Sequence, residues 1–257
     1  MACCFSRGEA PPRVVVHELK RLHEDLSTKF DPDSNEKALQ TLHTIWRVLL
    51  APEPFVRSSE LWKTVGFQGK DPVTDVRGGG LLAMECLATF ATRHTQGLKA
   101  MLRDLHELEH ISPESFYPIS TTAIMLCSKL CEACGLWAGV RGPIKPEQLE
   151  ALVHAPAPTD FASDIWCILP EKRHRGGFYE LFALLLVDFH VRFVLNTASY
   201  MQANQVVKQS LDCLTHRLAS IRAEIVESLE VAIPIAAICA LVDCAMAAAA
   251  SSLHHLQ

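Results

Sequence analysis

The sequence has no excess of positive charge and no beginning typical of a secreted protein. Its 257 residues include 24 lysines and arginines against 29 aspartates and glutamates, a formal net charge of −5. Proteins that bind nucleic acid need cations to neutralise its phosphates, so we expect no nucleic-acid partner. The residues behind Met1 lack the apolar stretch of a secretory signal. We therefore expect a cytoplasmic protein whose ten cysteines are reduced thiols.

Two common catalytic patterns are also missing. The three glycines at 78–80 are not followed by the G-K-[ST] of a phosphate-binding loop, so we expect no nucleotide bound by this chain itself. No G-x-S-x-G nucleophile elbow is present either. We expect no cofactor and no substrate pocket of the protein's own.

One short pattern suggests zinc. Residues 106–110 fit H-E-x-x-H, which on a helix places two imidazoles, His106 and His110, on one face. A catalytic zinc site needs a third protein ligand, and the Ile-Ser-Pro-Glu that follows does not continue the longer metalloprotease pattern. A charged, solvated helix end explains the same residues, and we favour it over a metal site.

A second cluster suggests a metal through its cysteines. Cys127, Cys131 and Cys134 have the C-x3-C-x2-C spacing of some iron–sulfur proteins. They lie in an apolar helical segment, and no second group of thiols supplies the rest of a zinc knuckle. We expect buried, reduced thiols and no metal.

No segment alternates between apolar and polar residues in the way of a half-buried strand. Apolar residues recur instead at helical spacing. The segments 14–30 and 35–50 are amphipathic, and 178–195 is apolar enough to form the centre of the core. We predict an all-α, multi-helix domain, with further helices at 81–90, 98–108, 119–137 and 145–153.

A C-terminal helical extension follows this domain. Between 207 and 229, apolar residues recur at alternating spacings of four and three, which produces one seam that needs a partner surface. The domain's own first helices or another chain could cover this seam. The segment 231–250 is apolar but alanine-rich and contains Asp243, which costs a spanning helix about 2.5 to 3.5 kcal/mol, so we favour a loose or surface-docked tail over a membrane span.

These patterns divide the chain into a flexible N-terminal tip at 1–13, a helical domain at 14–208, and a C-terminal helix with its tail at 209–257. Cys3 and Cys4 in the tip are candidates for acylation, because two acyl chains anchor a protein to a membrane far better than one. An unmodified end is the alternative that we favour. Membrane association is therefore an open expectation.

One loop interrupts the helical pattern. Residues 61–82 place Arg77 between an Asp71-Pro72 turn, which disfavours helix, and the glycines at 78–80, which give the backbone unusual freedom. The helical pattern resumes directly after the glycines. Free amides at a helix N-terminus together with a fixed cation would suit a phosphate-bearing partner. Alternatively, Arg77 is a structural residue.

In that alternative, Arg77 pairs with Asp75 or Glu85 and only holds the turn. Charged loop residues are usually structural or solvated. Residue chemistry alone slightly favours this interpretation.

Residues across this loop resemble the signature W-x3-G-F-Q-x2-x-P-x-T-D-x-R-G-x-G of the ELMO (engulfment and cell motility) domain. Two further stretches agree with it, at 117–118 and 178–201, so the resemblance covers about 35–208. The residues that match the signature are Trp62, Gly66, Phe67, Gln68, Asp71, Pro72, Thr74, Asp75, Arg77, Gly78, Gly80 and Leu81.

The resemblance implies a helical fold and a role with small GTPases. Members built of little more than this domain resemble GTPase-activating proteins for GTP-bound Arf and Arl GTPases, with the signature arginine, here Arg77, as the catalytic finger. Such a protein activates its partner's reaction at or near a membrane. Larger relatives are scaffolds, so the alternative is a non-catalytic adaptor in small-GTPase, cytoskeletal or membrane-trafficking signalling.

The same resemblance assigns roles to the neighbours of Arg77. The glycines at 78–80 would let the backbone approach the partner closely, while Trp62 and Phe67 would brace the loop from the core side. Asp75 would hold the arginine in position before a partner binds. Gln68 would orient the attacking water or, in the interpretation we favour, form a hydrogen bond within the turn.

Overall fold

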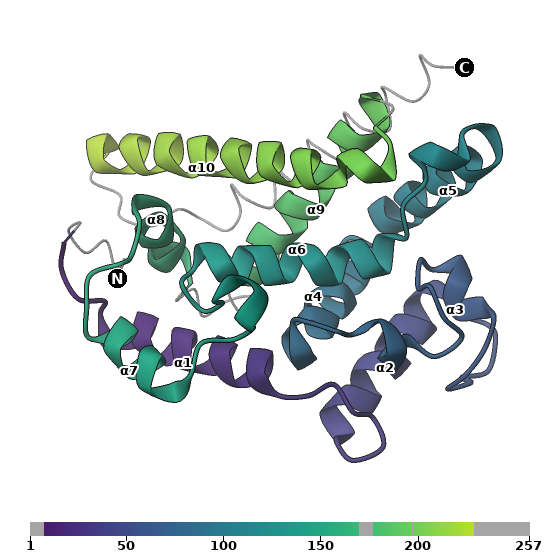
Figure 1. The fold of residues 1–257 in the computed structure, drawn as a ribbon, viewed down its shortest axis with the longest axis horizontal. Helices are drawn as coiled ribbons and strands as arrows, with labels where there is room; N and C mark the ends of the chain where they lie inside the picture. The colour runs from purple at the N-terminus through teal and green to yellow at the C-terminus, as the bar shows by residue number, and fades with distance from the viewer. Residues whose placement is uncertain (1–7, 170–176, 197, 229–257) are drawn as a thin grey trace.

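The computed structural model describes residues 8–169, 177–196 and 198–228. Within these ranges the chain forms ten α-helices and four short 3-10 turns, and no β-strand (Figure 1). The predicted all-α class is therefore confirmed. The remaining residues, among them Cys3, Cys4 and the alanine-rich tail, lie outside the described part.

The first two helices lie where amphipathic segments were predicted. They are α1 (Arg13–Ser27) and α2 (Glu36–Leu49). The side chain of Asn35 accepts hydrogen bonds from the amides of Lys37 and Ala38, which satisfies two of the free N–H groups at the start of α2. Both helices turn their apolar faces towards α4 (Gly80–Arg93).

The core is built around α4 and α9 (Gly177–Leu195). Most side chains of α9 are buried on every side of the helix, as expected for the centre of a core. α6 (Ile119–Ala133) packs against both α4 and α9. α4 thus contacts α1, α2, α6 and α9 and lies at the centre of the packing between these helices.

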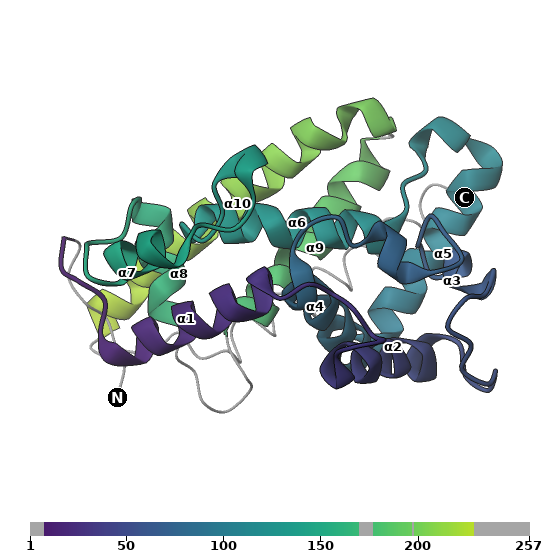
Figure 2. The ribbon, with the colours of Figure 1, turned by 60° about the horizontal axis from the view of Figure 1, so that its bottom comes forward.

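Further helices lie at the two ends of the molecule. α7 (Pro146–Val153) lies beside α1 at one end, whereas α3 (Leu61–Thr64) and α5 (Thr95–Ile111) lie at the other (Figures 1 and 2). α8 (Asp160–Ile168) was not predicted. It is short, and its Thr159 cap, which accepts a hydrogen bond from the amide of Ala162, is the one sequence signal for its start.

The last described helix, α10 (Ala203–Ser228), carries the predicted seam. Val207, Leu214 and Leu218 are buried where α10 packs on α8 and α9. The buried residues of the seam are therefore covered by α8 and α9. Residue 208, the predicted domain boundary, lies inside this helix. No helix among the described residues is long and apolar enough to cross a membrane.

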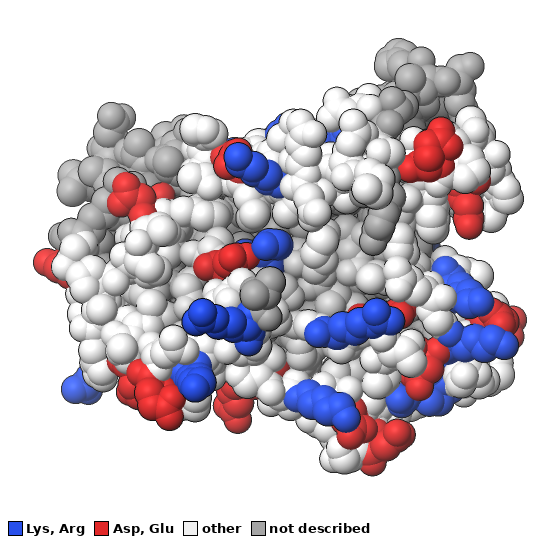
Figure 3. Space-filling view, in the orientation of Figure 1, with Lys and Arg blue, Asp and Glu red and all other residues white. Residues whose placement is uncertain are grey.

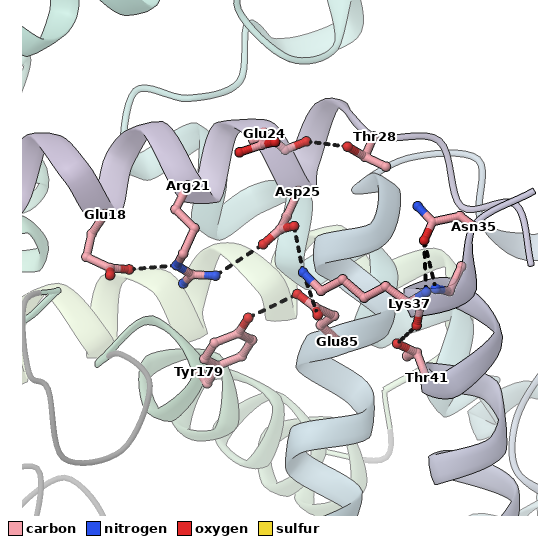
Figure 4. A network of polar contacts seen from close by, with 11 residues as sticks. Glu18, Arg21, Glu24, Asp25, Thr28, Asn35, Lys37, Thr41, Glu85 and Tyr179 are labelled. Atoms are coloured by element: carbon pink, nitrogen blue, oxygen red, sulfur yellow. Dashed lines mark hydrogen bonds and ion pairs between the residues drawn. The ribbon is translucent and has the colours of Figure 1, made fainter.

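A polar network joins four of the helices (Figure 4). Lys37 of α2 lies 2.8 Å from a carboxylate oxygen of Asp25 on α1 and 2.9 Å from one of Glu85 on α4. Tyr179 of α9 donates a hydrogen bond of 3.2 Å to the other oxygen of Glu85. Partial burial of the ammonium opposes its charge, but the two carboxylates outweigh this effect and raise the pKa of Lys37.

Candidate functional site

The signature loop, residues 61–82, contains α3, a 3-10 turn at Pro72–Asp75 and the start of α4. Asp71 caps the 3-10 turn, because its carboxylate accepts a hydrogen bond of 3.0 Å from the amide of Val73. The hydroxyl of Thr74 donates to the carbonyl of Asp71 at 2.8 Å. The segment before Arg77 is thus fixed by its own side chains.

The two signature aromatics lie in the core below this loop. Trp62 has no exposed surface, and its ring packs edge-on against Trp46, with centroids 4.9 Å apart, and against Phe67, at 5.6 Å. The indole N–H donates to the carbonyls of Val56 and Arg57 at 3.1 Å each. These contacts are those of a residue that braces the loop from inside.

Gly66 allows the loop to meet the start of α6 closely. Its φ is +85°, and a Cβ at this position would lie only 2.9 Å from the backbone amide of Ser120. Its carbonyl accepts a hydrogen bond of 3.1 Å from that amide. Gly66 therefore has a structural role.

Arg57 is a structural arginine that the sequence patterns did not reveal. Its Nε donates to one oxygen of Asp71 at 3.2 Å and its Nη2 to the other at 3.4 Å, a bidentate pair. Arg57 lies in the irregular segment before α3, and it reaches Asp71 only because the chain folds back through 14 positions of sequence. The arginine that forms an ion pair with the signature loop is therefore Arg57.

Arg77 is exposed on the outer side of the loop. Its amide donates to the carbonyl of Asp75 at 2.9 Å, and its Nε donates to the carbonyl of Thr74 at 3.3 Å. Within the described ranges it forms no ion pair with any carboxylate. The two remaining nitrogens of the guanidinium are available to a partner.

Neither carboxylate considered as a partner of Arg77 is used in that way. Asp75 is buried, and its Oδ2 accepts hydrogen bonds from the amides of Gln68, at 2.6 Å, and Gly69, at 3.4 Å. Without this acceptor, two N–H groups of the turn would lose their partner. Glu85 belongs to the network with Lys37 (Figure 4). The Asp75 carboxylate therefore does not hold Arg77 as expected, and the contact between the two residues is made by their backbone.

The start of α4 faces another helix end. Gly80 has φ +52°, and a Cβ there would lie 2.3 Å from the carbonyl oxygen of Leu26 and 2.6 Å from that of Thr28. The amide of Leu81 donates to the same carbonyl of Thr28 at 2.9 Å. At the N-terminus of α4, the amide of Leu81 is thus occupied by a carbonyl at the end of α1, and Gly80 allows the two helix ends to pack closely.

Comparison with known protein families supports the resemblance found in the sequence. A profile of the ELMO/CED-12 family matches residues 20–207, well over half of the chain. The chain belongs to the ELMO/CED-12 family.

Several curated relatives carry the same domain. Ankyrin repeat and ELMO domain-containing protein D of Dictyostelium discoideum is 30% identical over 188 residues, which are 72% of this chain and 13% of the relative. ELMO domain-containing protein 1 of Homo sapiens is 29% identical over 182 residues, 69% of this chain and 52% of the relative. The chain thus spans about half the length of these relatives or less.

A groove opens on the other side of the ELMO signature loop. It has a volume of about 770 Å³ and is bounded by the ends of α3, α5 and the segment before α6. Gln68 lies at its edge with an exposed side chain, and its amide group forms no hydrogen bond with the described residues. The predicted bond within the turn is made by the backbone N–H of Gln68 instead.

Of the three residues that define H-E-x-x-H, only His106 lines this groove. The rings of His106 and His110 are in contact on α5, with centroids 4.6 Å apart. In the part of the chain that the structure describes, no three potential ligands come together to hold a metal ion. The solvated helix end that we favoured fits this placement.

The cysteines of the ELMO domain core are buried and free. Cys127, Cys131 and Cys134 have no exposed surface, and the sulfur of Cys127 lies 3.9 Å from that of Cys86 on α4. Burial raises the pKa of the Cys86 and Cys131 thiols, because a thiolate is costly in an apolar interior. They are the buried thiols that the sequence indicated.

A buried polar chain lies behind the groove. The hydroxyl of Tyr117 lies 2.8 Å from Nδ1 of His190, whose Nε2 lies 3.4 Å from a carboxylate oxygen of Asp104. Burial raises the pKa of Tyr117, and the negative charge of the nearby Asp104 adds to this effect. The three residues come from positions far apart in sequence, so no local pattern could have grouped them. The hydrogen bond to His190 fixes the position of Tyr117, which belongs to the family-like stretch at 117–118.

Proposed function

We propose that this ELMO domain is a GTPase-activating protein for GTP-bound Arf- or Arl-type small GTPases and that Arg77 supplies an arginine finger. The single observation that supports this proposal most is the exposed guanidinium of Arg77, which has no carboxylate partner within the described residues, on a loop whose turn is held by hydrogen bonds to the carboxylates of Asp71 and Asp75. A structural arginine is expected to be paired, as Arg57 is. Fixing the loop beforehand reduces the entropy lost when the side chain is inserted into a partner.

The chemistry needs little else from this chain. A GTPase already holds nucleotide and magnesium, and negative charge grows on the transferring phosphoryl group during hydrolysis. A guanidinium inserted in trans can donate two hydrogen bonds to that charge. Arginine fingers are worth about 10³ to 10⁵ in rate, or roughly 4 to 7 kcal/mol of barrier, so one side chain can account for the activity.

The test is single-turnover GTP hydrolysis on a panel of Arf and Arl proteins. We expect the wild type to accelerate hydrolysis by at least one of them and Arg77→Lys to lose nearly all of this acceleration, because lysine cannot reproduce the two-pronged contact. Arg103→Lys on α5, another exposed arginine, is the matched control and should keep full activity. Acceleration that is indifferent to Arg77 would contradict the proposal.

The groove beside Gln68 favours a second candidate, a non-catalytic adaptor. This role needs a surface that holds a partner, and the groove offers apolar walls from Phe67, Leu102 and Phe116. An adaptor would bind a GTPase or another signalling protein without accelerating hydrolysis by any member of the panel. The same assay therefore separates the two functions.

A further inference from the structure

A tight turn at residues 137–143 follows α6 and adjoins the signature loop. Trp137 and Pro143 pair across its base, and the amide of Ala138 donates to the carbonyl of Gly142 at 2.8 Å. The amide of Arg141 donates back to the carbonyl of Ala138 at 3.1 Å. These bonds close the turn on itself, so Arg141 is carried by a fixed backbone.

Trp137 connects this turn to the residue after Arg77. A Cβ built on Gly78 would lie 3.5 Å from the Trp137 ring, which is an ordinary packing distance. The indole N–H donates to the carbonyl of Gly139 inside the turn. Trp137 remains partly exposed, and because its polar atom is satisfied internally, the ring offers apolar surface to the outside.

Arg141 is a second exposed cation in this region. Like Arg77, it forms no ion pair in the described part of the chain. The Trp137 ring packs beside Gly78, the residue after Arg77, and Arg141 follows Trp137 by four positions in the same closed turn. An interface that covers about 800 Å² per partner is roughly 30 Å across, so one partner can contact both. Basic side chains prevail over acidic ones in the band below α6 on the face shown in Figure 3.

We propose that the 137–143 turn is a second contact site for the GTPase. By binding the GTPase, the turn holds it in place against Arg77. This inference rests on the proposed function. Trp137 supplies apolar contact and Arg141 supplies charge, and these two residue types dominate the energetic centres of protein interfaces. The partner's nucleotide is strongly anionic, so a cation beside the finger also speeds the encounter.

The two arginines then have different effects on the reaction. Arg77 acts on charge that develops in the transition state, so its loss lowers the maximal rate. Arg141 acts on association, so its loss raises the concentration of activator needed for half-maximal rate and leaves the maximal rate unchanged. Its contribution weakens as salt is added, because exposed charges are screened.

The experiment measures single-turnover hydrolysis against activator concentration at low and high salt. For Arg141→Glu we expect the half-saturating concentration to rise roughly tenfold at low salt and less at high salt, with an unchanged maximal rate. Arg141→Lys, which keeps the charge, should stay close to the wild type. Arg103→Glu on α5, at the other end of the molecule, is the matched charge-reversal control and should change nothing (Figure 1).

A parallel arm measures binding to the GTPase loaded with a non-hydrolysable GTP analogue. We expect Arg141→Glu to weaken this binding by the same factor. If Arg77-dependent acceleration is present but Arg141→Glu changes neither half-saturation nor binding, the turn is not a contact site and the proposed function stands. If the wild type binds without accelerating hydrolysis, the proposed function fails, and the binding of Arg141→Glu still decides the role of the turn.

Discussion

The two sides of the signature loop hold their charged residues in opposite ways. On the inner side, Asp75 is buried and its carboxylate serves backbone amides, while Arg57 and Asp71 form a bidentate pair. On the outer side, Arg77 is exposed and bonded only to carbonyls. Asp75 and Arg77, two positions apart, thus have different roles. Because the inner side is fixed by its own hydrogen bonds, the outer side can carry Arg77 without an ion-pair partner.

The largest expected effect comes from replacing each of the two arginines, Arg77 and Arg57, by lysine in separate variants. Arg77→Lys should lower the accelerated hydrolysis rate by about 10³ or more and leave the melting temperature unchanged. Arg57→Lys should lower the free energy of unfolding by about 1 kcal/mol, since the pair with Asp71 is partly solvated, and the melting temperature by about 2 to 4 °C. Calorimetry and single-turnover kinetics on both variants test this. If Arg77→Lys melts earlier, the outer arginine is structural and the contrast between the two sides is lost.

Trp62→Ala should produce the largest loss of stability on the inner side. Removing a fully buried indole from its contacts with Trp46 and Phe67 costs about 3 to 5 kcal/mol. Chemical denaturation measures the change in the free energy of unfolding. A loss below about 1 kcal/mol would mean that the aromatic cluster does not brace the loop.

Gly80→Ala should cost about 2 to 4 kcal/mol, because the added methyl group meets the carbonyls at the end of α1 and the residue keeps a positive φ. Gly139→Ala is the matched control. Gly139 has a similar φ of +58°, but its nearest neighbour would lie 3.8 Å from the new Cβ. The same denaturation experiment compares the two. Equal losses would show that backbone conformation alone, and not contact between α1 and α4, explains the glycine.

Gln68→Ala should have the smallest effect on stability, within about 0.5 kcal/mol, because the backbone and not the side chain of Gln68 is bonded to Asp75. Single-turnover hydrolysis with this variant then tests the remaining role. A drop in rate at unchanged stability would support a position next to the attacking water. A clear loss of stability would instead show that the amide group does hold the turn.

Helical spacing predicted the class of fold and most helices, because the distribution of apolar residues along a helix is a local property. α8 was not predicted, since nine residues give too little periodicity to stand out. In the site, the signature pattern identified the aromatics and Arg77. It could not identify Arg57, whose partner lies 14 positions away, or the 137–143 turn, which meets the signature loop through the packing of Trp137 beside Gly78.

By itself, the sequence determined that this chain is helical, that one glycine-rich loop interrupts the helices, and that this loop carries an ELMO signature with a single arginine. The tertiary structure alone decided which charges are used inside the protein and which remain outside. Periodicity follows from neighbours along the chain, whereas the pairing of a charge depends on which distant segments fold against it. For that reason the inward Arg57 and the outward Arg77 are distinguishable only after the helices have packed.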